Sequence, residues 1–557
     1  MKKFERYRLS RVLFAVITVF LLAGASKARA NVYASNMRLN GGATNLTVVP
    51  GAPIAIDYIL NEPASQGVTI QVLAGATLVR TLTIAAGNPG TLAGANTVTW
   101  DGLNATSNVP PAGTYSISIT AGSLGYSAWT PITDDDNNYL LDGRGIAVDR
   151  NPTSPYYGRI FVANSFLGGS PGTTYGDNLG ILVFNADASI ADPNIPVDGG
   201  YSWSDNDVSP WKIKVSSDDF VYASEAVNGG RVYRWDPNVT TNSFVAALRS
   251  DNRPANASLS GPFIAGSGTN TQIWMCDTNP GSPASLGVLK WVVGTNGTCA
   301  ANDTGRAVIG VGGSLTVAPY DVALDPAGNI YVCQYTSTAG DPVQRVFRFK
   351  AYDPSTNGNA PELTADWAVG GGDDTYGAAS GIAVDPTGTY VAVAFFGAAP
   401  DNLVTNGNTK ILYATNGALV TNLDLGIPVK GTATHQDSDC AWDAAGNVYY
   451  IDTWAGVWRA ISPPGTNHST TLAPATVQTS LPTRPLITTV GVTNGTVTLN
   501  FTGAASDPAG AFALQSSGRP GGTYTNAANA NIVQTGTGLF RATVPVNGPV
   551  LFYRVQR

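Results

Sequence analysis

The sequence is short of charged residues and shorter still of histidine and cysteine. Charged residues make up 12% of its 557 residues, against roughly 25% in a typical protein. Two histidines are too few for a His-rich zinc site, and the four cysteines show no CxxC spacing, which argues against a zinc cluster. No stretch after residue 30 is long and apolar enough for a transmembrane helix. No phosphate-binding or dinucleotide motif occurs in a strand–helix–strand setting, so these enzyme classes are disfavoured.

Glycine and proline are plentiful instead. The chain has 63 glycines and 35 prolines, with abundant Asn, Thr and Ser, which is typical of many short strands joined by tight turns. Hydrophobic residues make up 43%, enough to fill packed cores. At roughly 100–200 residues per domain, the length predicts several domains. We therefore expect an all-β chain with more than one core.

The first 30 residues have the pattern of a signal peptide. Basic residues precede the apolar stretch Val12 to Ala25, and Ala28-Arg29-Ala30 forms an A-x-A cleavage site. We expect residues 1–30 to be removed and the chain to be exported, whether secreted, periplasmic or held at the cell surface. This segment carries seven basic residues and one acidic residue, so removing it from 31 basic and 38 acidic residues leaves 24 and 37, a net charge of −13. That charge argues against nucleic acid or anionic lipid as a partner.

Export also permits disulfide bonds. The four cysteines are Cys276, Cys299, Cys333 and Cys440. Cys276 and Cys333 occupy the same position in successive repeats, described below, which disfavours a bond between them. Two alternatives stay open: a Cys276–Cys299 bridge, or four buried free thiols.

Residues 31–125 form the first predicted domain. Residues 54–60 and 68–72 alternate with period two, as half-buried strands do. Residues 94–102 read Gly-Ala-Asn-Thr-Val-Thr-Trp-Asp-Gly, and Val-Pro-Pro-Ala-Gly-Thr-Tyr follows at 109–115. These residues resemble the immunoglobulin-like domain of the flagellar hook-capping protein, FlgD, which also occurs as an added module in exported bacterial proteins. The resemblance implies a β-sandwich that serves as a spacer or assembly domain, without a flagellar role for the whole chain.

A unit of three strands recurs six times between residues 126 and 463. Its clearest copy begins Tyr320-Asp-Val-Ala-Leu-Asp-Pro-Ala-Gly-Asn and continues with Ile330-Tyr-Val-Cys-Gln. A single antiparallel meander of this size cannot bury both of its faces, so we expect the copies to pack on one another. The first strands are predicted to begin at Arg144, Trp211, Phe263, Tyr320, Ser380 and Ser438. The second strands are predicted to end at Asn164, Ser224, Asp277, Gln334, Ala394 and Asp452.

The recurring A-V-D-P-x-G-N-[IV]-Y-V pattern resembles the NHL repeat. This resemblance implies a six-bladed β-propeller over residues 126–463. A solenoid is the structural alternative, but Asp-Pro-x-Gly hairpins at blade spacing favour the propeller. We expect residues 126–132 to supply an outer strand that completes the last blade, with residues 470–479 as the alternative.

The rest of the chain is predicted to be a linker and a small domain. Residues 464–485 are rich in Pro, Thr and Ser, which is typical of a linker. Residues 486–557 contain short strands between Gly-rich turns and resemble the C-terminal immunoglobulin-like domains of exported bacterial proteins that close on a Phe-Tyr-Arg strand. That domain serves either as a sorting or attachment signal or as a structural cap. The predicted fold class is all-β, with a six-bladed β-propeller flanked by two immunoglobulin-like β-sandwich domains.

Candidate ligand-binding residues follow from the propeller resemblance. In a propeller, first strands begin and second strands end on one face near the axis, and that face usually binds ligands. Trp211, Phe263 and Tyr320 would suit a sugar or a peptide there. Most of the second-strand ends are polar where a core would be apolar, and water in a central channel explains this as well as a ligand does. The predicted ligand-binding set is Arg144, Trp211, Lys212, Phe263, Tyr320, Asp321 and Gln334.

Calcium is the cofactor that the carboxylates could bind. Oxygen ligands for calcium are available from Asp277, Asp321, Asp439 and Asp452, and His435 lies near the sixth unit. Propellers related to the NHL type include metal-dependent lactonases and lyases, so a calcium-dependent hydrolase or lyase is one alternative function. No catalytic residue can be named from the sequence.

The sequence favours an exported, non-catalytic binding or scaffolding protein. Its ligand would be a glycan, a peptide or a protein on the propeller face. A third alternative is a subunit of a surface array or filament that self-associates through its end domains.

Overall fold

The computed structural model describes the chain from residue 32 to residue 557, apart from some short segments. Those segments are 134–137, 168–174, 193, 196, 205–207, 227–229, 280–284, 336–342, 357, 372–375, 396–408, 424–435, 454, 480–483, 505–506 and 547–550. The predicted signal peptide and His435 therefore lie outside the described residues. Contacts divide the chain into two compact units. The first comprises residues up to Asn45 with Ile54–Trp100 and Ser116–Thr476, and the second comprises Leu46–Pro53, Asp101–Tyr115 and Val477–Arg557.

The described chain is built from short β-strands, as its composition predicts. The helical segments whose bounds the structure gives are short 3-10 helices. They lie at Thr241–Ser243, Ser250–Asn252, Gly268–Asn270 and Ala509–Ala511. In the part of the chain that the structure describes, no helix has the length and apolar character needed to cross a bilayer.

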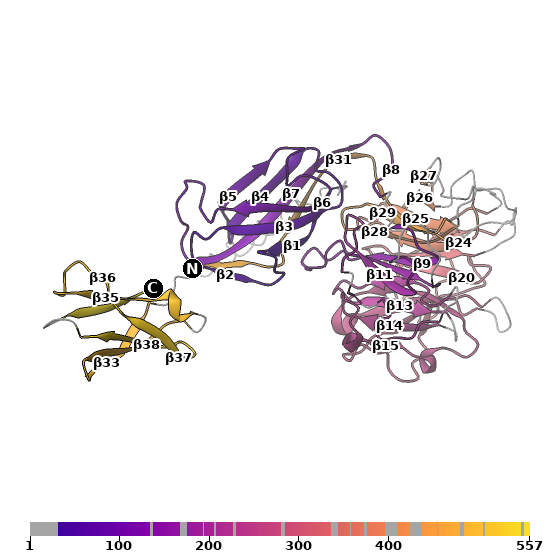
Figure 1. Ribbon diagram of the computed structural model, residues 1–557. Helices are drawn as coiled ribbons and strands as arrows, with labels where there is room; N and C mark the ends of the chain where they lie inside the picture. The colour runs from indigo at the N-terminus through magenta and orange to yellow at the C-terminus, as the bar shows by residue number, and fades with distance from the viewer. Residues whose placement is uncertain are drawn as a thin grey trace, which may run out of the picture. The chain divides into compact units, whose positions relative to one another are not determined.

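The N-terminal residues form two facing groups of strands (Figure 1). One sheet has the order β1(Ala34–Leu39)–β3(Ile54–Leu60)–β6(Gly94–Trp100). The other has the order β2(Leu46–Val48)–β32(Val477–Thr479)–β7(Gly113–Tyr126)–β4(Gly67–Ala74)–β5(Thr77–Ile84), and β31(Gly465–Leu472) also pairs with β7. Inward-facing Ile56, Ile70 and Ile119 are fully buried, and Trp100 is 1% exposed. The alternation of β3 and β4 is that of strands with one buried face.

Two strands of this region come from the segment predicted to be a linker, and that prediction is corrected. β31 pairs antiparallel with β7 from Tyr126↔Gly465 to Ser118↔Leu472, and β32 pairs with residues 113–115 of the same strand. The segment is rich in threonine, which resembles a linker by composition. Threonine is also β-branched, and such residues pack well on a pleated sheet. Asn467, Thr471 and Thr479 are buried, which a flexible linker would not require.

Six antiparallel sheets follow in chain order between β8(Thr130–Pro131) and β30(Val457–Ser462). Each is a meander in which strands that are consecutive in sequence pair with one another, as the repeat pattern predicts. The first three are β9(Gly143–Val148)–β10(Ile160–Asn164)–β11(Gly180–Phe184), β12(Ile213–Val215)–β13(Val221–Glu225)–β14(Arg231–Trp235)–β15(Val245–Leu248), and β16(Leu259–Ala265)–β17(Gln272–Asp277)–β18(Val288–Val292)–β19(Arg306–Ile309). The other three are β20(Pro319–Leu324)–β21(Ile330–Gln334)–β22(Val346–Phe349)–β23(Trp367–Val369), β24(Ala379–Val384)–β25(Tyr390–Phe395)–β26(Thr409–Tyr413)–β27(Leu419–Asn422), and β28(Asp437–Trp442)–β29(Val448–Asp452)–β30–β8.

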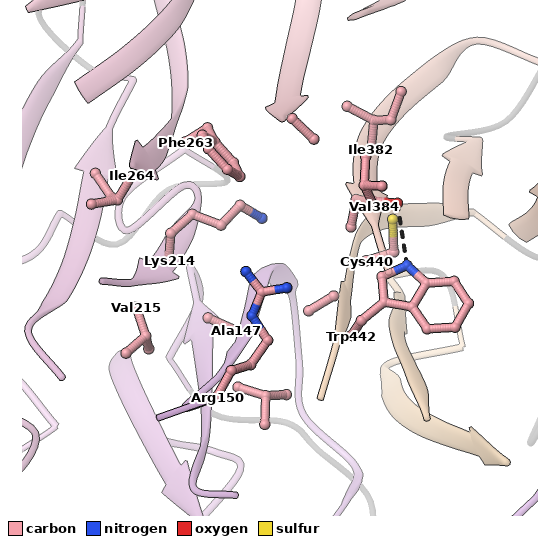
Figure 2. A pocket seen from close by; sticks show the side chains of 14 residues that line it. Ala147, Arg150, Lys214, Val215, Phe263, Ile264, Ile382, Val384, Cys440 and Trp442 are labelled. Atoms are coloured by element: carbon pink, nitrogen blue, oxygen red, sulfur yellow. Dashed lines mark hydrogen bonds between the residues drawn. The ribbon is translucent and has the colours of Figure 1, made fainter. Parts of the chain in front are cut away.

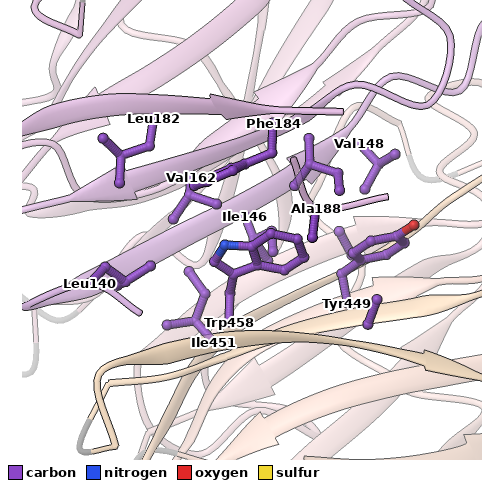
Figure 3. Close-up of a cluster of buried hydrophobic side chains, with 13 residues drawn as sticks. Leu140, Ile146, Val148, Val162, Leu182, Phe184, Ala188, Tyr449, Ile451 and Trp458 are labelled. Carbon is purple, nitrogen blue, oxygen red and sulfur yellow. The ribbon is translucent and has the colours of Figure 1, made fainter. Parts of the chain in front are cut away.

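Each pair of consecutive sheets encloses an apolar core, and the sixth sheet encloses one with the first. Figure 3 shows the core between the sixth and first sheets, where Trp458 and Ile451 pack against Phe184 and Leu182. All four side chains are fully buried, and each contributes about 1.5–3 kcal/mol by leaving water. The first strands also contact one another from sheet to sheet, and β28 contacts β9.

The predicted outer strand is present, whereas the predicted start of one first strand and the predicted ends of two second strands are wrong. Thr130 and Pro131 pair with Ser462 and Ile461, so β8 completes the sixth sheet. In the third sheet the first strand begins at Leu259, four residues before Phe263. The third copy has Gly266 after its first strand, where the first, fourth, fifth and sixth copies have Asp149, Asp325, Asp385 and Asp443, so its sequence does not mark the end of that strand. The second strands of the second and fifth sheets end at Glu225 and Phe395, one residue beyond the predicted Ser224 and Ala394.

The C-terminal residues form a small β-sandwich, as predicted. One sheet has the order β33(Leu486–Thr493)–β34(Thr496–Thr502)–β38(Leu539–Pro545)–β37(Asn531–Gly536), and the other β36(Thr525–Asn526)–β35(Ala513–Ser517)–β39(Phe552–Gln556). Phe501, Phe512 and Phe540 meet between the sheets with ring centroids 4.6–5.4 Å apart. All four cysteines of the chain are buried free thiols, so the Cys276–Cys299 bridge is not formed.

Candidate ligand-binding site

The polar side chains at the ends of the second strands hold the chain just ahead of the first strands. Asn164, Asp277 and Asp452 each accept the backbone N–H of the residue immediately before the first strand of their own sheet, at 2.9, 2.9 and 3.1 Å. Gln334 instead donates through Nε2 to the carbonyl oxygen of Val317 at 2.5 Å. All four side chains are buried, where a polar group needs a hydrogen-bond partner. Their polarity therefore has a structural cause in each sheet.

In five of the six sheets, the first strand carries a β-bulge near its start. The register with the second strand shifts there, which leaves one extra residue in the first strand. In four of these sheets the extra residue is one that the sequence placed at a strand start: Arg144, Tyr320, Ser380 or Ser438. A bulge re-aims side chains, and here it does so at the same place in successive sheets.

The position that follows alternates between glycine and a charged residue from sheet to sheet. In order, its occupants are Gly145, Lys212, Gly261, Asp321, Gly381 and Asp439. A Cβ atom on Gly261 would lie 2.1 Å from Cγ of Lys212, and one on Gly381 would lie 2.7 Å from Cα of Asp439. Three sheets therefore omit a side chain so that the other three can place a long or charged one in the same space.

The charged residues of this position meet Lys214 in a buried group that we name the first-strand ion cluster: Lys212, Lys214, Asp321 and Asp439. Nζ of Lys214 lies 2.9 Å from Oδ2 of Asp439, and Nζ of Lys212 lies 3.3 Å from Oδ1 of the same carboxylate. Lys212 also donates to the carbonyl oxygens of Ser380, at 2.9 Å, and Ser438. Lys212 is 1% exposed, and both aspartates are fully buried.

The two aspartates of the cluster also tie neighbouring sheets together. Asp321 accepts the backbone N–H of Ile382 in the next sheet at 3.1 Å, and Asp439 accepts that of Ile146 at 3.1 Å. Burial raises the pKa of Asp321 to about 6, although both lysines of the cluster act in the opposite direction. Burial lowers the pKa of Lys214, but the attraction of Asp439 and Asp321 outweighs it, and the net pKa is raised. The attraction between its lysines and its aspartates therefore stabilises the cluster.

The four aspartates proposed to bind calcium occupy two kinds of position. Asp321 and Asp439 belong to the ion cluster, where lysines face them. Asp277 and Asp452 accept backbone N–H groups at the second-strand ends. Over the described residues, no group of three or more His, Cys, Asp or Glu side chains is arranged to hold a metal ion. His435 is outside that part of the chain.

The residues predicted at the strand starts form a half-buried aromatic group. Arg144 lies over the ring of Trp211 at 5.4 Å and pairs through Nε with Asp142 at 2.9 Å. Tyr320 packs on Tyr335 with ring centroids 5.0 Å apart. Burial raises the pKa of both tyrosines, and the positive charge of Arg144 acts in the opposite direction. Phe263 does not belong to this group, because the register of β16 places it near the end of its strand.

A cavity opens at the other end of the first strands, and we name it the first-strand cavity. Its inner part has a volume of about 50 Å³ and its outer part about 570 Å³. All six sheets contribute to the wall, through Val148, Val215, Ile264, Ala323, Val384 and Trp442 among others. The outer rim is formed by the turns after the first strands, at Asn151, Ser217, Gly266, Pro326, Pro386 and Ala444. Figure 2 shows Phe263 on one side of this space and Cys440 and Trp442 on the other.

Two cations point into this cavity, and the sequence analysis assigned a role to neither. Figure 2 shows the charged ends of Lys214 and Arg150 directed into the same space. Lys214 could have been found from sequence, because it lies two residues after Lys212, and side chains two apart share a face of a strand. Arg150 stands where Pro326 and Pro386 follow the turn aspartate in other copies, so its departure from the repeat was also readable.

Comparison with known proteins identifies one segment. Residues 42–125 match the family model of the FlgD Ig-like domain. The FlgD Ig-like match confirms the resemblance seen in the sequence of the N-terminal region. No curated protein sequence matches the chain. Among solved structures, the calcium structure of Trichoderma reesei Carbohydrate-Active Enzymes Family AA12 aligns at 12% identity over 61% of this chain and 98% of that chain, with a TM-score of 0.34. A TM-score of this size does not establish a common fold.

Proposed function

We propose that the six sheets form a closed six-bladed β-propeller of the NHL type. Three observations support it. The sheets are consecutive meanders, each pair shares a core, and the sixth sheet shares one with the first. The first strands then line the axis, the ion cluster fills it, and the first-strand cavity is its open end.

On this architecture, the protein is an exported, non-catalytic binding protein whose ligand occupies the first-strand cavity. The observation that carries this function is the cavity itself: its outer part has a volume of about 570 Å³, its inner wall is mostly apolar, and the turns of its rim add polar residues. Pockets of roughly 300–1,000 Å³ with mostly apolar walls and few polar groups are typical ligand sites. Lys214 links the inner wall of the cavity to the buried ion cluster.

Export follows from the predicted signal peptide and agrees with the FlgD Ig-like match, since such domains occur in exported proteins. The N-terminal sandwich then acts as a spacer that presents the propeller.

Blocking the cavity tests this function. Ser217 is exposed at the rim and loses one hydrogen bond, to the carbonyl oxygen of Gly266, when it is replaced. Ser217→Trp should fill the entrance and abolish binding of small aromatic fragments measured by saturation-transfer NMR. Val490→Trp, at a site 63% exposed in the C-terminal sandwich, is the matched control and should bind as the parent does. Equal binding by parent and Ser217→Trp would place the fragments elsewhere and overturn the proposal.

One further observation favours self-association as a second function. Leu486, Val490 and Val492 are 66%, 63% and 65% exposed on β33, which is an edge strand of the C-terminal sandwich. An apolar edge strand is a ready template for pairing with another chain. Size-exclusion chromatography of the protein over a range of concentrations tests it. Val490→Lys should shift any oligomer toward monomer, and a protein that is monomeric throughout would exclude this function.

A further inference from the structure

The first-strand cavity contains a cation that has no direct ion-pair or hydrogen-bond partner among the described residues, although the carboxylates of Asp443 and Asp385 act on its charge from a distance. Arg150 is exposed within the cavity and lines both its inner and its outer part. Among the described residues, none forms an ion pair or a hydrogen bond with its guanidinium. This distinguishes Arg150 from Arg159 nearby, which donates to the carbonyl oxygen of Pro237 and to Oδ1 of Asn238 at 2.8 and 2.9 Å.

The acidic residues of the rim are already engaged. Asp385 accepts the backbone N–H groups of Thr389 and Tyr390 at 2.6 and 2.7 Å, which closes its own turn. Asp325 does the same in the fourth sheet, with the N–H groups of Ala327 and Asn329, both at 2.9 Å. Their oxygens therefore serve the backbone of the turns, and Arg150 keeps its donors for the cavity.

A second cation faces the same space from the inner wall. The Lys214 ammonium is held by the Asp439 carboxylate at 2.9 Å and reaches the cavity with a side chain 13% exposed. An ammonium has three donors, and the single carboxylate of Asp439 does not use them all. The charge of Lys214 is balanced within the ion cluster, so what it adds to the cavity is a hydrogen-bond donor.

The remaining wall is apolar and partly aromatic. Phe263 is half-buried on one side, and Trp442 donates its indole N–H to the carbonyl oxygen of Ala383 at 3.2 Å, which fixes its ring (Figure 2). Ile264 and Val384 extend the apolar surface toward the rim. Such a surface favours a flat hydrocarbon body over a heavily hydroxylated one.

We propose that the first-strand cavity binds a small carboxylate whose flat apolar body packs against Phe263 in the outer part of the cavity. Arg150 receives the carboxylate through two parallel N–H···O bonds, the geometry that a guanidinium offers to a carboxylate. Lys214 offers a further N–H donor at the inner end. This inference rests on the function proposed above and names the chemistry of its ligand.

Benzoate and benzamide provide the test, since they share a shape and differ in charge. We expect benzoate to bind the purified protein and benzamide to bind at least tenfold more weakly, measured by saturation-transfer NMR with competition. Arg150→Gln should weaken benzoate binding by roughly 10- to 100-fold, because a hydrogen bond to a charged group is lost. Arg150→Lys should retain part of the affinity, and Arg519→Gln, an exposed arginine of the C-terminal sandwich, should leave it unchanged.

The outcomes separate this inference from the function on which it rests. Equal binding of benzoate and benzamide, both lost in Ser217→Trp, would overturn the carboxylate and leave the cavity as a ligand site. Unchanged benzoate affinity in Arg150→Gln would also overturn it. If neither compound binds, the carboxylate inference fails, and neutral fragments with Ser217→Trp then decide the proposed function. Thermal unfolding of each variant shows whether a loss of binding reflects a loss of fold.

Discussion

The first strands carry charge at two levels, and the two levels differ in how that charge is balanced. In the ion cluster, Lys212 and Lys214 lie within 3.3 Å of Asp439, and every member is buried or nearly so. At the cavity, Arg150 is exposed and has no described partner. A compensated buried charge holds a structure together, whereas an uncompensated charge in a pocket is available to a ligand. We therefore expect mutations in the ion cluster to lower the stability of the protein, and mutation of Arg150 to leave its stability nearly unchanged.

The largest effect is expected from breaking the compensation in the cluster. Asp439→Asn leaves two lysines buried beside a neutral group and also weakens the bond to the N–H of Ile146. We expect the free energy of unfolding to fall by about 3–5 kcal/mol, measured by urea denaturation. Asp353→Asn removes a carboxylate from an exposed turn and should change it far less. Similar losses in the two variants would show that the cluster is not compensated as described.

A smaller loss is expected from filling the space that admits Lys212. In Gly261→Ala the new Cβ would meet Cγ and Cβ of Lys212 at 2.1 and 2.3 Å, so β16 or the lysine must move. Overpacking of this kind costs about 1–3 kcal/mol. Gly491→Ala is the matched control, because nothing lies within 4 Å of its added Cβ. Chemical denaturation of both variants checks the difference, and a neutral Gly261→Ala would contradict the alternation of glycine and charge.

The pH dependence of stability is expected to report on Asp321. Its pKa is about 6 in the folded protein against 3.8 ordinarily, so the folded state holds this proton more tightly. Its contribution to stability is therefore fully present below about pH 4 and is lost as the pH rises through about 6. The difference in unfolding free energy between the parent and Asp321→Asn should change over that window.

Other buried carboxyls change stability in the same direction, so the parent alone is not informative. Burial raises the pKa of Glu62 and Asp149 to about 7 and that of Asp443 to about 6. These groups are present in both proteins. Their contribution therefore cancels when the pH profile of the unfolding free energy of Asp321→Asn is subtracted from that of the parent. A flat difference between pH 4 and 7 would mean that Asp321 titrates normally.

The smallest effect on stability is expected at the cavity. Arg150→Gln removes a charge that has no direct ion-pair or hydrogen-bond partner among the described residues, so the unfolding free energy should change by no more than about 0.5 kcal/mol. Urea denaturation beside Asp439→Asn gives the contrast directly. A loss of several kcal/mol would make Arg150 a structural residue and would end the distinction between the two levels.

The sequence predicted most of the strands, because each repeat marks its first two strands with alternation and a turn. The bounds of β10, β21 and β29 agree with the predicted second strands. The outer strands β15, β19, β23 and β27 were not predicted, since three or four residues are too few to show a period. The register of β16 was missed because Gly266 stands where four other copies have an aspartate directly after the first strand.

The site was predictable in its residues more than in its geometry. Lys212, Asp321 and Asp439 were singled out as charged entries near the axis, and the structure brings them together. Their pairing depends on lysines and glycines from sheets far apart in sequence, which no local pattern reveals. The cavity lies at the strand ends that the prediction did not consider, because its wall is ordinary apolar sequence until six strands converge.

The pairing of β7 with β31 has a consequence for the modular history of the chain. Tyr126 and Gly465 face each other across two antiparallel strands, so the chain leaves and re-enters the N-terminal sandwich at one place. Residues 127–464 therefore lie between two strands that pair with each other. A short hairpin turn between these two residues would restore an uninterrupted host domain. The same attachment point could therefore carry another guest without disturbing the host.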